Sequence, residues 1–173
     1  MRSFYMEARP MRRREREISD PAEIFAIARR CQVLRLALPD QDAPYVVPLS
    51  FGLEQVDGRL VFYVHCAEEG RKLELIGGGC PVGVELDRFL GYGSSGSSST
   101  AYYESIIGRG RVEPVSGAAA VHGLELLLEH CGRASGGSFD ACLPRTAVLR
   151  ITLEECSAKA HPLPLGQTGE FPA

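Results

Sequence analysis

Short alternating apolar runs, joined by turn signals, limit the folds open to this chain more than any other feature. In residues 33–38 every second position is leucine, as expected of a strand with one buried face. Asp57-Gly58, between two later runs, is a strong hairpin signal. The six expected strands are residues 33–38, 45–54, 60–65, 81–87, 100–115 and 147–153. Because successive strands come mostly in hairpins, the pattern favours an antiparallel barrel over a doubly wound sheet.

Helices and loops are expected between these strands. Asp20 followed by Pro21 predicts the start of a helix that ends near Arg30. Two further helices are expected over residues 71–76 and 118–131. Pro48 cannot donate a hydrogen bond to a sheet, so it marks an edge strand or a bulge. Residues 88–99 are rich in glycine and serine and are expected to form a loop.

The composition fits one globular domain. A chain of 173 residues with 45% hydrophobic and 24% charged residues can build a real core. We expect a basic N-terminal arm over residues 1–17, a folded domain over 18–157 and a loosely ordered tail over 158–173. No apolar run approaches the roughly 20 residues that span a bilayer, and no secretory signal is evident. The expected location is therefore the cytoplasm, without membrane attachment.

Charge and cysteine spacing exclude several other classes. Residues 1–17 hold six arginines and three glutamates, so this arm carries +3 and the rest of the chain −6. No aromatic and basic platform follows the arm, which argues against nucleic-acid binding and favours an arm that is solvated or packed on a partner subunit. The six cysteines form no Cys-x-x-Cys pair, so we expect free thiols and no metal site. Cys66 alone lies where a reactive thiol could serve a site.

A candidate phosphate site lies where the strand over 60–65 gives way to a helix. The helix opens with Gly70-Arg71-Lys72, which combines flexible backbone, a planar fork of donors and a second positive charge. The first amides of a helix also lack internal partners. The alternative interpretation is an exposed helix start with solvated charges.

Four segments, taken in order, resemble the pyridoxamine 5'-phosphate oxidase-like superfamily, and within it the nitroimidazole-resistance (Nim) reductase group. They are residues 12–18, 45–52, 65–72 and 103–110. The resemblance spans about residues 12–155. It implies a mainly β fold, a six-stranded antiparallel split β-barrel with short flanking helices. It also implies a homodimer that holds FMN at the interface between its subunits.

The resemblance assigns roles to individual residues. The phosphate would be bound by Gly70, Arg71 and Lys72, with the Ser105 hydroxyl added unless Ser105 is an ordinary strand residue. His65 would lie near the reactive face of the flavin and donate a proton to the substrate, or else be structural. The strand along the flavin ring would comprise Val46, Val47, Pro48, Leu49 and Ser50, or else form a simple edge strand.

The implied function is an FMN-dependent oxidoreductase that reduces a small acceptor such as a nitroaromatic or a quinone. One departure from the Nim pattern concerns the substrate, because Ser94–Ser99 replace a region that carries a cysteine in that group. Two alternatives remain. One is a non-catalytic barrel that binds flavin or haem, with His65, His122 or His161 as axial ligand. The other is a dimer with an empty groove that acts through interaction alone.

Overall fold

The computed structural model describes residues 11–95, 98–134, 138–169 and 171. Its helices are α1 (Pro21–Arg30), α2 (Arg71–Ile76) and α3 (Gly117–His130), with short 3-10 turns η1 (Arg14–Arg16) and η2 (Leu143–Arg145). Its strands are β1 (Glu17–Ile18), β2 (Leu34–Leu38), β3 (Tyr45–Leu49), β4 (Gly52–Val56), β5 (Arg59–Cys66), β6 (Cys80–Ser95), β7 (Ser98–Val115) and β8 (Ala147–His161).

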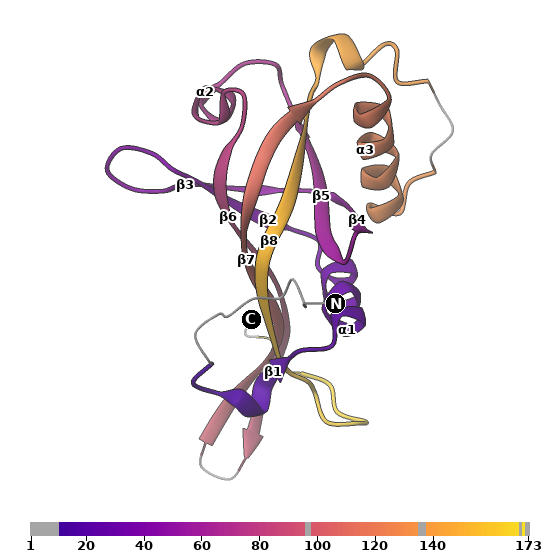
Figure 1. Ribbon diagram of the computed structural model, residues 1–173. Helices are drawn as coiled ribbons and strands as arrows, with labels where there is room; N and C mark the ends of the chain where they lie inside the picture. Colours follow the sequence, from indigo (N-terminus) through magenta and orange to yellow (C-terminus); the bar gives the residue numbers. More distant parts are fainter. Residues whose placement is uncertain (1–10, 96–97, 135–137, 170, 172–173) are drawn as a thin grey trace.

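The strands form one curved antiparallel sheet (Figure 1). The main path runs β3-β2-β6-β7-β8-β5-β4, and β1 pairs separately with the far end of β8. Within the described residues β3 and β4 do not pair with each other, so the sheet curls without closing. The expected mainly antiparallel β architecture is confirmed, with eight strands where the sequence indicated six.

One of the two extra strands comes from a run that the sequence analysis treated as a single strand. The run over 45–54 is not one strand, because the ladder breaks at Ser50 and Phe51 and leaves β3 and β4 on opposite edges of the sheet. Pro48 lies in β3, so its expected place in an edge strand is confirmed. The other extra strand is β1, whose two residues lie on either side of the expected boundary between the arm and the folded domain.

The glycine- and serine-rich residues do not form a simple loop. β6 and β7 remain paired as far as Ser95 and Ser98, with one register shift between Phe89 and Gly91. Expectations for residues 96–97 lie outside the described part of the chain. β8 likewise continues to His161, past the expected end at residue 153, because its second half pairs with β7 on one side and β1 on the other.

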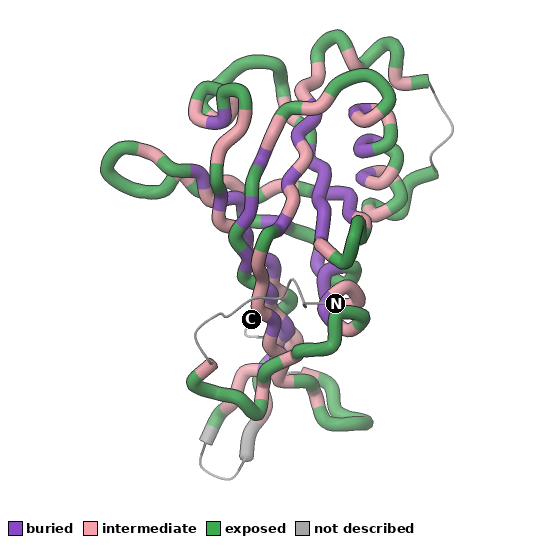
Figure 2. The backbone as a smooth tube through the Cα atoms, in the orientation of Figure 1, coloured by how far each residue is buried: buried purple, intermediate pink, exposed green. Residues whose placement is uncertain are grey.

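The core lies inside the curl of the sheet, where buried positions follow the central strands (Figure 2). Its largest fully buried side chains include Phe51, Phe62, Leu86, Ile106 and Ile151. α1 packs Ile24, Ile27 and Ala28 into it and begins as expected, with the Asp20 side chain accepting from the Ala22 amide at 3.0 Å. α2 adds Ile76.

α3 covers part of the opposite face of the sheet, over β4, β5 and β8. The remainder of that face, over β2, β6 and β7, is not covered by a helix in the part of the chain that is described. None of the helices described here has the length and apolarity needed to cross a membrane.

Candidate functional site

The start of α2 presents two adjacent cations. Gly70 precedes the helix with φ of 120°, a conformation that side chains with a Cβ rarely adopt. Its carbonyl accepts from the amides of Leu73 and Glu74, at 2.9 and 3.2 Å. Arg71 and Lys72 therefore fill the first turn, where backbone amides have no intrahelical acceptor. The expected helix over 71–76 is confirmed.

Arg71 reaches across to the turn between β2 and β3. Its Nε donates to Asp40 Oδ2 at 3.2 Å, and its Nη2 donates to the same oxygen. Its guanidinium also stacks on the Tyr45 ring, with Cζ 5.4 Å from the ring centroid. The hydrogen bond to Arg71 lowers the pKa of the Asp40 carboxyl, and in return the carboxylate raises the pKa of Arg71.

Lys72 differs from Arg71 in its surroundings. Its side chain is half-buried, and it forms no ion pair with any residue in the described ranges. Lys72 therefore has no ion-pair partner among these residues, whereas Arg71 is paired with Asp40. Glu74 also lies in the first turn, so the start of α2 offers an anionic ligand two cationic donors without an excess of positive charge.

Four of the five predicted ring-binding residues lie in the edge strand β3, and Ser50 follows its end. Val46, Pro48 and Ser50 are exposed, whereas Val47 and Leu49 are half-buried against the core. Among described strands β3 pairs only with β2, so alternate backbone groups along β3 point away from the sheet. The edge combines apolar side chains with available donors and acceptors.

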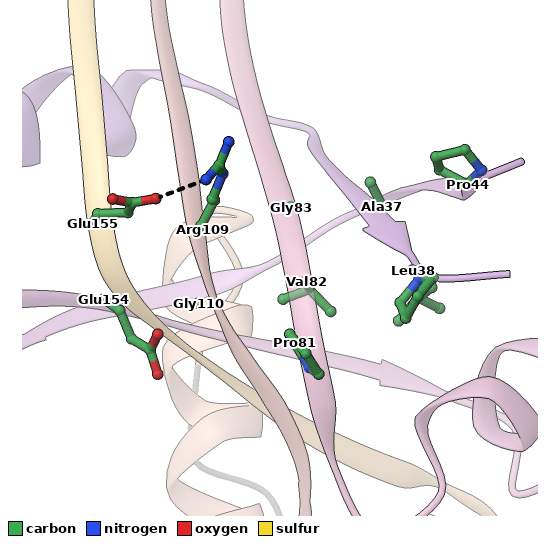
Figure 3. A pocket seen from close by; sticks show the side chains of 11 residues that line it. Ala37, Leu38, Pro44, Pro81, Val82, Gly83, Arg109, Gly110, Glu154 and Glu155 are labelled. Carbon is green, nitrogen blue, oxygen red and sulfur yellow. Dashed lines mark ion pairs between the residues drawn. The ribbon is translucent and has the colours of Figure 1, made fainter. Parts of the chain in front are cut away.

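A cavity of about 650 Å³ lies beside this edge, on the uncovered face of the sheet (Figure 3). Ala37, Leu38 and Pro44 border it on one side, and Arg109 and Glu155 lie on the other, 3.4 Å apart as an ion pair. Pro39 and Pro44, which flank the turn that carries Asp40, both line the cavity. Arg71, Lys72 and the residues of β3 do not line the cavity themselves. They meet it at one corner of the sheet through this turn, which leads into β3 and holds Arg71 by way of Asp40.

Ser105 does not reach this corner within a single chain. It faces away from the core, since its neighbours Glu104 and Ile106 are buried. Arg109 lines the cavity, and Ser105 lies four residues before it on β7, which corresponds to about 13 Å of strand.

His65 is exposed near the end of β5, on the face turned away from the core. It lies opposite Val148, which packs against Ala120 and Leu124 of α3. Of the four histidines, His65 is the one whose ring makes no hydrogen bond to another described residue. Its ring is thus available to a ligand.

The sequence interpretation missed several residues near these positions. The sequence placed Asp40 in a turn and Tyr45 at the start of a strand, and it did not indicate that either residue contacts Arg71. Tyr103, two residues before Ser105, accepts from Arg16 Nη1 at 3.4 Å, and Lys159 Nζ lies 5.5 Å from its ring centroid. Burial alone would raise the pKa of Tyr103, but the Arg16 hydrogen bond and the Lys159 charge lower it.

The thiols and carboxylates do not form a metal centre within the described residues. All six cysteines are free, and Cys66 is half-buried. Burial raises the pKa of Cys31 to about 12 and that of Cys156 to about 11, so both remain protonated at neutral pH.

Solved structures show the same fold. A candidate 5-nitroimidazole antibiotic resistance protein from Bacteroides thetaiotaomicron has a TM-score of 0.71 and 23% identity, with 83% of this chain and 85% of that one covered. A flavocytochrome from Azotobacter vinelandii has a TM-score of 0.70 and 18% identity, with coverages of 89% and 73%. The FAD and heme binding protein from Mycobacterium smegmatis has a TM-score of 0.69 and 17% identity, with coverages of 90% and 77%.

The sequence comparisons agree with the fold. No curated protein matches the chain significantly. The family model described as pyridoxamine 5'-phosphate oxidase matches residues 20–160, which include α1, the edge strand β3, the start of α2 and most of β8. The chain belongs to the pyridoxamine 5'-phosphate oxidase family.

Proposed function

We propose that this protein binds FMN and reduces a small acceptor such as a nitroaromatic or a quinone. The observation that carries the proposal is the shared corner of the sheet, where two cations, an edge strand and a cavity of about 650 Å³ lie together. Family membership supports a flavin cofactor, and so do the names of two similar structures, a flavocytochrome and an FAD and heme binding protein.

The residues at this corner fit the parts of the cofactor. Arg71 and Lys72 supply charged hydrogen-bond donors for the phosphate. The open backbone edge of β3 supplies donors and acceptors of the kind that a flavin ring requires. The cavity volume lies within the range of small-molecule sites.

A homodimer is part of the proposal. Ser105 lies about 13 Å along β7 from Arg109, the nearest residue of that strand that lines the cavity, so it contributes to a phosphate site here only if a second copy supplies it. The uncovered sheet face also carries Val46 and Ile107, which are 54% and 58% exposed. A partner that covers this face would bury both side chains and bring its Ser105 towards the corner.

Bound flavin supplies hydride or single-electron transfer, and the protein orients it and limits the access of water. In the proposed reaction the His65 imidazole donates a proton to the reduced substrate atom, since histidine exchanges protons near neutral pH. Its exposure and lack of a described hydrogen-bond partner leave the ring free for that role.

Absorbance spectroscopy tests the cofactor directly. The purified protein is incubated with FMN, passed through a desalting column and scanned. Retained flavin bands near one FMN per chain are the expected result. Loss of all flavin on the column would refute the proposed function.

Haem binding is a second candidate, favoured by one similar structure named for FAD and heme binding and by the free ring of His65. A Soret band in the same spectrum, abolished by His65→Ala, would establish it in place of the flavin reductase. A spectrum with flavin bands alone would exclude it.

A further inference from the structure

Asp40 is the one carboxylate that forms an ion pair with the proposed phosphate-binding cations in the described part of the chain. We propose that Asp40 is a positioning residue, which fixes the Arg71 guanidinium so that its unused N–H groups face the phosphate of the cofactor. The inference rests on the proposed function and adds a specificity role within the same site. Through this contact Asp40 would make the site prefer flavins that carry a phosphate over those that do not.

The geometry leaves Arg71 able to serve two partners. Asp40 Oδ2 accepts from Nε and from Nη2, which occupies one side of the planar guanidinium. Nη1 and the second hydrogen on Nη2 form the opposite edge, and that edge matches two phosphate oxygens. The guanidinium side chain is 62% exposed, so this edge is open to a ligand.

The carboxylate is itself held in place. Asp40 Oδ1 accepts from the Gln41 amide at 2.9 Å, and the carboxylate side chain is only 15% exposed. The Tyr45 ring lies under the guanidinium, with 5.4 Å between Cζ and the centroid. Arg71 is therefore fixed on one side by a rigid anion and on one face by an aromatic ring.

Fixing Arg71 in advance favours binding. An arginine side chain has many rotamers, and holding one of them before the ligand arrives removes that entropy cost from the binding step. The opposing effect is repulsion between Asp40 and the phosphate. It is limited here because the Arg71–Asp40 pair is neutral as a unit, while Lys72, without a described ion-pair partner, supplies a second cationic donor.

The test measures the affinities of FMN and riboflavin by quenching of flavin fluorescence. Riboflavin lacks the phosphate, so it reports on the ring site alone. We expect Asp40→Ala to weaken FMN binding about tenfold, the scale of one arginine's rotamer freedom, and to leave riboflavin binding unchanged. Asp42→Ala is the matched control, because Asp42 is exposed in the same turn and has no described partner.

A double-mutant cycle separates positioning from general damage. Asp40→Ala should have no further effect on FMN affinity when Arg71→Ala is already present. Asp40→Asn, which keeps the side-chain volume, should show a smaller loss in the same direction. Circular dichroism spectra that match the wild type confirm that the variants fold.

The outcomes are distinct. Tighter or unchanged FMN binding in Asp40→Ala overturns the positioning role and leaves the flavin function standing. Equal losses for FMN and riboflavin also overturn it, because the effect is then not directed at the phosphate. If the wild-type protein binds neither flavin, the proposed function fails, and the role of Asp40 fails with it.

Discussion

Helix α3 approaches β4 so closely that position 52 has no room for a side chain. A Cβ built on Gly52 lies 2.4 Å from the Leu127 amide nitrogen and 2.6 Å from the Leu126 carbonyl carbon. Both are backbone atoms, so no rotamer change relieves the contact. Ordinary contact begins at 3.4 Å, so in Gly52→Ala the helix must retreat by about 1 Å.

The cost follows from what α3 buries. Leu124 and Leu127 are on the buried side of this helix, with 6% and 7% of their surface exposed. If the helix moves away from the sheet, gaps open around both side chains. Overpacking costs typically 1–3 kcal/mol, and a helix that moves as a unit puts this substitution at the upper end, about 3 kcal/mol. For a domain of this size that corresponds to a fall in Tm of roughly 6–12 °C.

Thermal and urea unfolding, followed by circular dichroism at one protein concentration, measures the loss. Gly78→Ala is the matched control, because a Cβ there meets nothing within 4 Å and its φ is not positive. We expect the control to equal or slightly exceed the wild type, through reduced freedom of the unfolded chain. If Gly52→Ala proves as stable as Gly78→Ala, the close approach of α3 to β4 is refuted.

Four further predictions address other contacts. Glu104→Gln should lower the free energy of unfolding by about 2 kcal/mol, because this 9%-exposed residue accepts two hydrogen bonds from Arg30 at 2.7 and 3.0 Å; an unchanged urea midpoint would contradict it. Ile107→Glu should convert the proposed dimer to a monomer in analytical ultracentrifugation, and a persistent dimer would argue against the sheet face as the interface. His65→Ala should preserve FMN affinity but slow nitroaromatic reduction at least about tenfold, and unaffected turnover would make His65 structural. Since folding lowers the pKa of Asp40, its contribution to stability should be complete above the ordinary value of 3.8 and decline below it. The urea midpoint should therefore fall less between pH 7 and pH 3 in Asp40→Asn than in the wild type, and equal falls in both proteins would refute the argument.

The strands with strict alternation were predictable from sequence. β2 places Leu34, Leu36 and Leu38 on the buried face because side chains alternate along a strand, and burial makes that alternation visible. The N-cap of α1 was equally clear, because Asp20 and Pro21 act through local backbone chemistry. Local rules succeeded where the neighbouring residues settle the structure.

The misplaced boundaries depended on distant partners. The hairpin of β6 and β7 continues through serine and glycine because each strand pairs with the other, and strand propensity does not report such pairing. The second half of β8 is a strand because β1 and β7 flank it, although its sequence resembles a tail. Tertiary hydrogen bonding outweighed local composition in both cases.

The candidate site was only partly visible in the sequence. Gly70, Arg71 and Lys72 are consecutive, so their clustering needed no fold. The contact between Arg71 and Asp40 joins residues 31 positions apart, and only the packing of α2 beside the β2–β3 turn creates it. The spacing of residues in a sequence does not indicate which side chains from distant elements will meet.

The position of β8 has a consequence for how the protein is made. β8 is the last strand in chain order, yet it lies between β7 and β5 in the middle of the sheet. Until the ribosome has released residues 147–161, the β4–β5 hairpin has no strand to join it to the rest of the sheet. The nascent chain therefore exposes unpaired strand edges until β8 has been made, and chaperones would protect it during that interval.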